Sequence, residues 1–281
     1  MGNRKALVVG IDDYSAVPLH GCVNDAEDVA ALLSRNDDRS INFSVQLRTS
    51  KTDEINKPAL KKWISDCFAG DDEIALFYFS GHGQIDACGG YIVTPDYAPM
   101  DWGISMQDIL NYANNSKCQN KVIILDCCHA GSVGAINTLG QQTAIINEGV
   151  TILTASSFDE AAAEINGHGV FTELLTEALK GGAADITGNI SPGSIYAYID
   201  RALGPWEQRP VFKTNVKRFI SLRTVIAPID INIVRRITVY FDEPTTKLPL
   251  NPSYEPTNNT KTEHKVIEPY SIEKNVAIFS D

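Results

Sequence analysis

Two short stretches of the sequence place side chains of catalytic type directly after an apolar run. His82 follows the run 73–79 within Ser-Gly-His-Gly, and Cys128 follows the run 122–125 within Asp-Cys-Cys-His-Ala-Gly. A cysteine attacks carbonyl carbons as the thiolate, and because the free thiol has a pKa of about 8.5 it needs a base such as histidine to take its proton. The glycines let the backbone turn sharply and approach a substrate closely. The two stretches therefore indicate nucleophilic catalysis by a cysteine–histidine pair.

The alternation of an extended chain predicts which of these side chains face the same way. Residues two apart in a strand share a face, so Ser80 and His82 are expected on one face of the first stretch. In the second stretch Cys128 is expected to share a face with Asp126, while Cys127 and the histidine after Cys128 point the opposite way. His82 is then the base that activates Cys128. A cysteine after an apolar strand is more often a small core residue, and this alternative stays open from the pair alone.

Short apolar runs alternate with helical patterns along most of the chain. We expect strands over residues 5–10, 43–47, 73–79, 91–94, 122–125 and 150–155. We expect helices over residues 24–34, 57–68, 105–112, 170–179 and 194–203, the first with Asn24 or Asp25 as its N-cap. Alternating strands and helices form a mainly parallel sheet covered on both faces, and ligands bind at the carboxyl ends of its strands. Both stretches lie at such ends.

Composition excludes several classes of protein. The chain has 281 residues, of which 43% are hydrophobic, so it can build a core and is not disordered as a whole. Its net charge of −11 argues against a nucleic-acid partner, and the basic residues between 201 and 236 are interpreted as a solvated face. No apolar run reaches 18 residues, so we expect no membrane span. The start of the chain is a better strand than a signal peptide, and six cysteines without a CxxC pair or metal-ligand spacing indicate a reducing, cytoplasmic compartment.

The amino-acid composition changes near the end of the sequence. Five of the 13 prolines fall within residues 244–281. We therefore expect one domain over residues 1–225, followed by a possible edge strand over 235–241 and an extended, Pro-rich tail within residues 226–281.

Taken together, the motifs resemble the caspase-like cysteine peptidases (family C14), most closely the metacaspases and orthocaspases. Besides the two stretches above, residues 10–14, 19–26 (Leu-His-Gly-Cys-Val-Asn-Asp-Ala) and 168–172 (His-Gly-Val-Phe-Thr) match motifs of that family. The similarity covers about residues 4–222. It implies an α/β caspase-like three-layer sandwich with a mostly parallel sheet of about six strands. It also implies a large-subunit-like part, 1–148, and a small-subunit-like part, 149–225.

The resemblance assigns roles to the reactive residues. Cys128 is the nucleophile, His82 is the general base, and the backbone N–H groups of Gly83 and Cys128 form the oxyanion hole. Such donors stabilise a tetrahedral transition state by roughly 3–4 kcal/mol.

The resemblance also implies cleavage after arginine or lysine, the residue called P1. The family's acidic S1 pocket maps onto Cys22, Asp25, Ser80 and Asp126. Two carboxylates can bind a guanidinium through charge-assisted bonds. Asp25 as a helix cap and Asp126 as a polar strand end remain the structural alternatives. The protein substrate therefore carries a basic P1 residue, and a sensor or regulatory protein is a possible activator.

Calcium-dependent relatives bind the ion through aspartates, of which Asp96 and Asp101 are the candidate counterparts here. Residues 132–146 contain no acidic side chain, so a site with the six to eight oxygen ligands that calcium takes looks incomplete. We expect no required cofactor and no obligatory calcium. Two other functions stay open: a catalytically silent adaptor or scaffold, and a relative with a different P1 preference.

Overall fold

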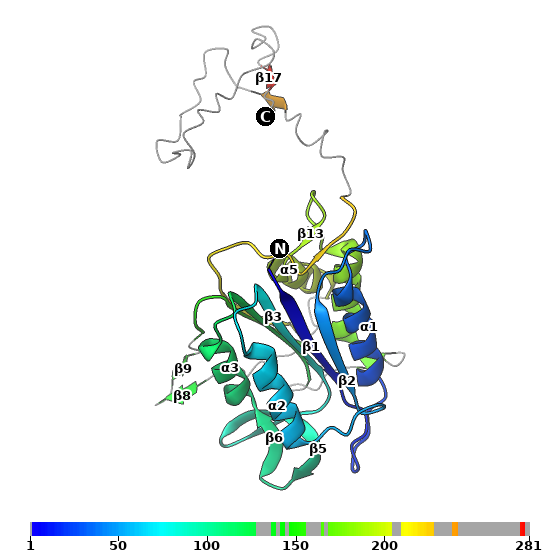
Figure 1. The fold of residues 1–281 in the computed structure, drawn as a ribbon, viewed down its shortest axis with the longest axis vertical. Coiled ribbons are helices and arrows are strands. Elements are labelled where there is room, and N and C mark those ends of the chain that lie inside the picture. The colour runs from blue at the N-terminus through cyan, green and yellow to red at the C-terminus, as the bar shows by residue number, and fades with distance from the viewer. Residues whose placement is uncertain are drawn as a thin grey trace. The chain divides into compact units, whose positions relative to one another are not determined.

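The computed structural model describes residues 2–127, 136–138, 141–143, 146–155, 164–165, 168–203, 209–227, 238–240 and 276–278. Cys128 and the histidine after it lie outside these ranges. The chain divides into two compact units, Met1–Ile226 and Ala227–Asp281. The first unit contains the sheet and helices that position the candidate site (Figure 1).

A six-stranded sheet forms the centre of the first unit, in the order β14-β10-β7-β3-β1-β2. Its strands are β1 (Arg4–Gly10), β2 (Ser44–Thr49), β3 (Ile74–Ser80), β7 (Asn120–Asp126), β10 (Val150–Thr154) and β14 (Val211–Asn215). Five run parallel, and β14 pairs antiparallel with β10 at one edge. The expected mostly parallel sheet is confirmed. The sequence analysis did not predict β14.

Helices cover both faces of the sheet, so the expected three-layer sandwich is confirmed (Figure 1). The helices α2 (Lys57–Phe68) and α3 (Met106–Asn115) pack on one face, where Phe77 and Phe79 point. The helices α1 (Cys22–Ser34), α4 (Val170–Glu177) and α5 (Pro192–Ala202) pack on the other, where Leu76 and Tyr78 point. Strand β3 is buried along its whole length because both of its faces are covered.

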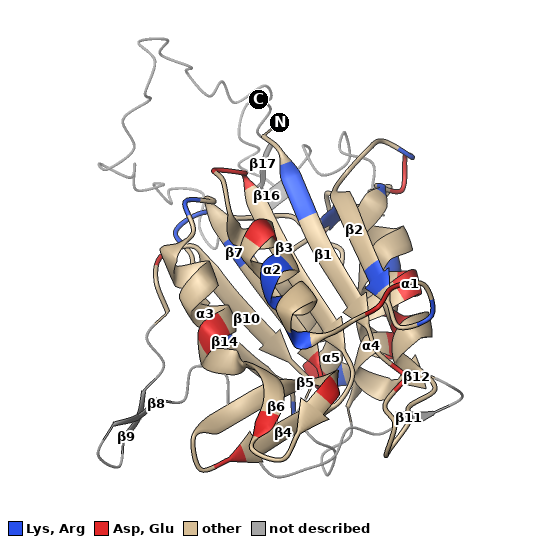
Figure 2. Cartoon of the chain, turned by 60° about the horizontal axis from the view of Figure 1, so that its bottom comes forward, with Lys and Arg blue, Asp and Glu red and all other residues tan. Residues whose placement is uncertain are grey.

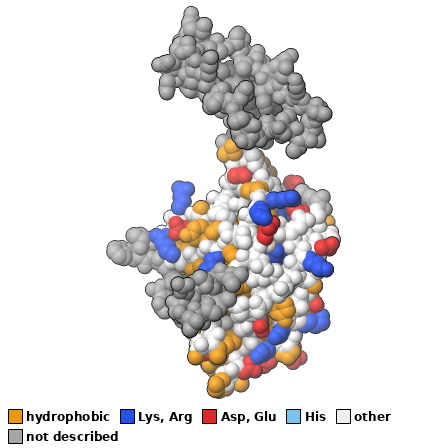
Figure 3. Space-filling model, turned by 90° about the vertical axis from the view of Figure 1, so that its left-hand side faces the viewer, with side chains coloured by type: hydrophobic (Ala, Val, Ile, Leu, Met, Phe, Trp, Pro, Cys, Tyr) orange, Lys and Arg blue, Asp and Glu red, His pale blue; other side chains and the backbone are white. Residues whose placement is uncertain are grey.

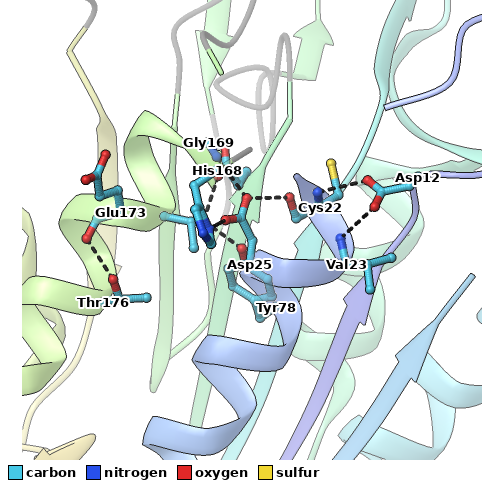
Figure 4. A network of polar contacts seen from close by, with 12 residues as sticks. Asp12, Cys22, Val23, Asp25, Tyr78, His168, Gly169, Glu173 and Thr176 are labelled. Atoms are coloured by element: carbon cyan, nitrogen blue, oxygen red, sulfur yellow. Dashed lines mark hydrogen bonds and ion pairs between the residues drawn. The ribbon is translucent and has the colours of Figure 1, made fainter. Parts of the chain in front are cut away.

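The helix starts show which local signals the sequence carries. Helix α2 begins and ends at the predicted residues. Its start is marked by Asn56, which accepts a hydrogen bond from the Ala59 N–H, and by a proline in the first turn. Helix α1 begins two residues earlier than predicted, and neither Asn24 nor Asp25 is its N-cap. The first N–H groups of α1 are satisfied from another part of the chain. Asp12 accepts from the N–H of Cys22 at 2.9 Å and from that of Val23 at 3.3 Å (Figure 4).

Smaller elements surround this core. A three-stranded sheet is formed by β4 (Gly83–Asp86), β5 (Gly89–Ala98) and β6 (Asp101–Ser105). Four further antiparallel pairs join β8 (Ile136–Thr138) to β9 (Gln141–Thr143), β11 (Glu164–Ile165) to β12 (His168–Gly169), β13 (Asn189–Ile190) to β15 (Arg223–Thr224), and β16 (Thr238–Tyr240) to β17 (Val276–Ile278). Helix α4 continues into a π-helical turn, Ala178–Gly182. Within the expected edge strand 235–241, β16 pairs with β17 and not with the six-stranded sheet.

Candidate active site

The carboxyl ends of three neighbouring strands meet at one edge of the sheet. Gly10 of β1 pairs with Ser80 of β3, and Ser80 pairs with Asp126 of β7. The last residues of these three strands therefore lie side by side, at the edge of an open α/β sheet where ligands bind.

Neighbouring residues fix the orientation of His82. Its ring packs against the ring of Tyr14, with 4.5 Å between centroids. Its Nε2 lies 2.7 Å from the carbonyl oxygen of Val17. A carbonyl only accepts, so Nε2 donates its hydrogen, and in the neutral imidazole the lone pair lies on Nδ1. His82 is thus held in a tautomer that can accept a proton at Nδ1.

The backbone around His82 is held as well. The His82 N–H donates to the Tyr14 hydroxyl at 3.1 Å, and that hydroxyl lies 3.2 Å from the Val93 carbonyl oxygen, to which it donates. Gly83, the predicted oxyanion-hole residue, begins β4 directly after His82. A cavity of about 180 Å³ opens here, lined by Tyr14, Val17, His82, Gly83, Gln84, Val93, Tyr97 and Trp102. Its aromatic walls suit an apolar part of a substrate.

The predicted alternation holds on one strand and fails past the end of the other. Asp126 contacts α4, whereas Cys127 belongs to the core on the opposite, α2–α3 face. Ser80 and His82 do not share a face as predicted, because Ser80 bonds to Asp25 on α1, whereas His82 packs against Tyr14, which belongs to the core on the α2–α3 face. Strand β3 ends at Ser80, so the two-residue period does not reach His82. The placement of Cys128 lies outside the described residues.

The four residues assigned to the S1 pocket lie together. The Ser80 hydroxyl donates to Asp25 Oδ2 at 3.4 Å and contacts the Cys22 thiol. A Cβ placed on Gly169 would lie 2.6 Å from Asp126 Oδ2 and 3.2 Å from Asp25 Oδ2, so both carboxylates border the same point. This buried cluster, Cys22, Asp25, Ser80 and Asp126, is called the acidic pocket below, after the S1 role that the family resemblance implies for it.

Asp25 is almost completely enclosed, with 1% of its surface exposed. Burial raises the pKa of this carboxyl, and the Gly169 N–H and His168 oppose that rise. Gly169 donates to Asp25 Oδ2 at 3.1 Å, and His168 Nδ1 lies 2.9 Å from Asp25 Oδ1 (Figure 4). Burial also raises the pKa of the Cys22 thiol, so this wall of the pocket is neutral. The Asp25 carboxyl is therefore already partly satisfied by donors of the chain itself.

The sequence analysis did not predict several contacts that shape the site. Val17 orients His82, Asp12 holds the start of α1, and His168 bonds to Asp25. Residues 168–172 were noted as a family motif, which was the available signal, but no role was predicted for His168 or Thr172.

The aspartates considered for calcium have other partners. Both carboxylate oxygens of Asp96 accept from the Lys57 N–H, at 3.0 and 3.1 Å, and Asp101 pairs with the Lys57 ammonium group. Among the residues that the structure describes, no group of three or more His, Cys, Asp or Glu side chains is arranged to hold a metal ion. The donor set at Asp96 and Asp101 does not fit calcium, because a lysine supplies the positive charge there.

The surface carries charges of both signs. Acidic and basic residues are scattered over the elements (Figure 2), and on the face seen in Figure 3 their side chains are interspersed. No helix within the described ranges has the length and apolar character needed to cross a membrane.

Comparisons with known proteins agree with this architecture. A family model for the caspase domain of the C14 peptidases matches residues 3–219. Over 152 residues, the chain is 30% identical to metacaspase-1 of Arabidopsis thaliana and 27% identical to metacaspase-1 of Kluyveromyces lactis. Each match covers 47% of this chain, and 40% and 34% of the two relatives, so the chain matches well under half of their length.

Solved structures show the same fold at low identity. A protein of Geobacter sulfurreducens aligns with a TM-score of 0.56 and 19% identity, over 80% of this chain and 99% of that one. Caspase-1 of Spodoptera frugiperda aligns with a TM-score of 0.55 and 12% identity, over 81% of this chain and 92% of its own.

Proposed function

The chain belongs to the caspase-domain family of cysteine peptidases, and on this premise we propose that it is an endopeptidase that cleaves proteins after arginine or lysine. Members of a peptidase family act on protein substrates. The P1 preference, the catalytic pair and the regulation are parts of the proposal. The main support for this proposal is the acidic pocket. There the carboxylates of Asp25 and Asp126, which come from different elements, lie next to the strand end that leads to Cys128.

In the proposed reaction the Cys128 thiol gives its proton to Nδ1 of His82, which the Val17 carbonyl leaves available. The thiolate forms a bond to the P1 carbonyl carbon, and the oxyanion accepts hydrogen bonds from the N–H groups of Gly83 and Cys128. The scissile C–N bond then breaks, and the amine leaves with the proton from His82. Water hydrolyses the thioester and regenerates the thiol.

The acidic pocket supports a cationic P1 side chain. A guanidinium is planar and binds carboxylates through paired N–H···O bonds, and it is more weakly hydrated than an ammonium group. A substrate with aspartate at P1 would bring a third negative charge to Asp25 and Asp126. The pocket therefore favours arginine and lysine and disfavours acidic residues.

The remaining parts of the proposal concern calcium, regulation and cellular location. We propose activity without a required calcium ion, supported by the Lys57 contacts of Asp96 and Asp101. Regulation by a partner and a cytoplasmic location rest on the sequence argument alone.

Cleavage of matched peptides tests the function. The wild type, Cys128→Ala, Asp25→Asn and Asp126→Asn are assayed on peptides with arginine, lysine, citrulline or aspartate at P1. Citrulline has the shape of arginine without its charge. We expect cleavage after arginine and lysine that depends on Cys128. Each pocket variant is expected to lose roughly 2–4 kcal/mol of transition-state binding for arginine, and much less for citrulline.

Other outcomes identify the alternatives. Cleavage of the aspartate peptide alone would refute the basic P1 preference. Absence of any cleavage, with and without cell extract as a source of activator, would favour the adaptor.

A further inference from the structure

A pair of buried hydroxyl groups lies directly behind the Asp126 carboxylate. Thr172 Oγ1 on α4 donates to Asp126 Oδ2 at 2.6 Å, and the Tyr78 hydroxyl on β3 lies 2.6 Å from the same Oγ1. Tyr78 is fully buried and Thr172 is 1% exposed. The three side chains therefore form a hydrogen-bonded chain that runs from the core to the acidic pocket.

The direction of this chain follows from its chemistry. A carboxylate only accepts, so the single hydroxyl hydrogen of Thr172 points to Asp126, and the Tyr78 phenol must donate to Thr172. Burial, followed by the negative charges of Asp126 and Asp25, raises the pKa of Tyr78 well above its usual value. The phenol therefore keeps its hydrogen near neutral pH and can donate it to Thr172.

We infer that Thr172, supported by Tyr78, is a positioning residue that sets the orientation of Asp126 for a cationic P1 side chain. The inference rests on the proposed function, since it concerns the same pocket. A bidentate guanidinium contact requires a defined carboxylate plane. A short charge-assisted bond to one oxygen from a helix anchored in the core provides that plane without touching the substrate.

The neighbouring contacts show that α4 serves both carboxylates. Gly169, directly before α4, donates to Asp25, and Thr172 lies within the first turn and donates to Asp126. One oxygen of each carboxylate is thus bound by the segment 169–172. This segment forms the N-terminus of α4, where negative charge is favoured. The P1 pocket depends on this segment as well as on the four residues that line it.

The test compares Thr172→Val, which keeps the shape and removes the hydroxyl, with Thr172→Ser, which keeps the hydroxyl, and with Tyr78→Phe. Thr176→Val is the matched control, because Thr176 lies on the same helix, is 6% exposed, and donates to the Glu173 carbonyl at 2.8 Å, away from the acidic pocket. Values of kcat and KM are measured on peptides that differ only in arginine or citrulline at P1. Thermal melting checks that each variant folds.

We expect Thr172→Val to raise KM for the arginine peptide about tenfold or more and KM for the citrulline peptide less than about twofold. Thr172→Ser should return both values to within about twofold of the wild type. Tyr78→Phe should act in the same direction by a smaller factor, and Thr176→Val should change neither peptide. Equal losses on both peptides in Thr172→Val, or no loss on arginine, would overturn the inference.

A binding measurement separates this inference from the proposed function. Agmatine, a small guanidinium compound, is titrated into Cys128→Ala and into Cys128→Ala with Thr172→Val. Weaker binding to the double variant supports the positioning role even if the wild type cleaves no peptide, in which case only the proposed function fails. Equal binding to both proteins, or binding to neither, overturns the positioning role.

Discussion

At the scale of single residues, two adjacent cysteines are predicted to have different roles. Cys127 is 1% exposed and packs into the core on the α2–α3 face, while Cys128 is the proposed nucleophile. Cys128→Ala should abolish peptide cleavage. Cys127→Ala should keep cleavage and lose about 1 kcal/mol of unfolding free energy, because a small cavity replaces the sulfur.

Peptidase assays and urea denaturation of the two variants check this prediction. An active Cys128→Ala together with an inactive Cys127→Ala would show that the strand register beyond Asp126 is reversed.

The same residues show how far alternation predicts a site. It placed Asp126 and Cys127 on opposite faces correctly, because β7 is regular to Asp126. It failed for His82, because β3 ends at Ser80 and the next residues turn. The partner that orients His82 is a backbone carbonyl, that of Val17, and no side-chain pattern in the sequence identifies a carbonyl.

The acidic pocket should respond to pH through Asp25. Because burial raises the pKa of Asp25, this carboxyl takes up a proton at a higher pH than an exposed aspartate as the solution is acidified. The neutral form no longer attracts a guanidinium. KM for an arginine peptide should therefore rise on acidification, while KM for the citrulline peptide stays nearly constant.

Two variants isolate this effect. Asp25→Asn should lose the pH-dependent difference between the peptides, and His168→Gln, which removes the titratable neighbour, should retain it. Identical pH profiles for arginine and citrulline in the wild type would contradict the role of Asp25.

The raised pKa also fixes the sign of a stability effect. A carboxyl whose pKa rises on folding stabilises the native state below its unfolded pKa of about 3.9, and this contribution is lost as pH rises through the folded pKa. When the pH is raised from about 4 to 7, the wild type should therefore lose more unfolding free energy than Asp25→Asn does. Urea denaturation at several pH values measures it, and a wild type that gains more stability than the variant would contradict the sign.

At the scale of elements, the junction of β12 and α4 limits what can stand next to the pocket. Gly169 has φ −69° and ψ 132°, which alanine adopts without strain. Its added Cβ, however, would lie 2.6 Å from Asp126 Oδ2. Gly169→Ala should therefore displace the carboxylate and lower kcat/KM for arginine peptides about tenfold, with a smaller effect on citrulline peptides.

Gly193→Ala in α5 is the matched control, because there the nearest atom to the new Cβ, Ser191 Oγ, is 3.9 Å away. The control should keep wild-type kinetics. Wild-type selectivity in Gly169→Ala would show that Asp126 does not need its observed position.

The proposed calcium independence can be tested at the start of α2. Asp96 accepts the N–H of Lys57 there, so Asp96→Asn should cost about 0.5–1 kcal/mol of stability through the loss of charge at a helix N-terminus. Peptide cleavage by the wild type should change less than about twofold between EDTA and added calcium. Activation by calcium in the wild type that Asp96→Asn abolishes would instead identify a calcium site.

Some helices and strands could be predicted from local sequence signals and others could not. Helix α2 carries its own start signal and was predicted to the residue. The start of α1 depends on Asp12, ten residues before Cys22, so no residue next to the helix signals where it begins. Strand β14, Val-Phe-Lys-Thr-Asn at the sheet edge, has only two apolar residues and no buried residue, so it carries a weak strand pattern. The other edge strand, β2, was predicted over residues 43–47 and is observed over Ser44–Thr49, so the position at an edge does not by itself hide a strand.

At the scale of the whole molecule, the sheet order brings together pocket residues that are distant in sequence. Asp25 and Gly169 are 144 residues apart and share a hydrogen bond. The family resemblance predicted the four pocket residues. It did not predict the donors from α4, because a contact between α1 and α4 depends on how both helices pack on one sheet face. The division into large- and small-subunit-like parts at residue 148 stays a prediction.

The last prediction concerns processing of the chain. The family resemblance implies maturation by a cut between the nucleophile and the small-subunit-like helices. Here no lysine or arginine occurs between Lys121 and Lys180. An enzyme with an anionic P1 pocket cannot use its own preference in that connection, so we expect activity from a chain that is uncut between residues 128 and 170.

Self-cleavage, where it occurs, should fall beyond the first compact unit, which ends at Ile226. The basic residues available there include Arg235, Arg236, Lys247, Lys261 and Lys265. A cut at these positions leaves the six-stranded sheet and both pocket carboxylates in one fragment, so activity should survive it. Intact-mass analysis of active wild type beside Cys128→Ala checks both statements. A Cys128-dependent cut between residues 128 and 170 would refute the prediction, and it would also contradict the basic P1 preference from which the prediction follows.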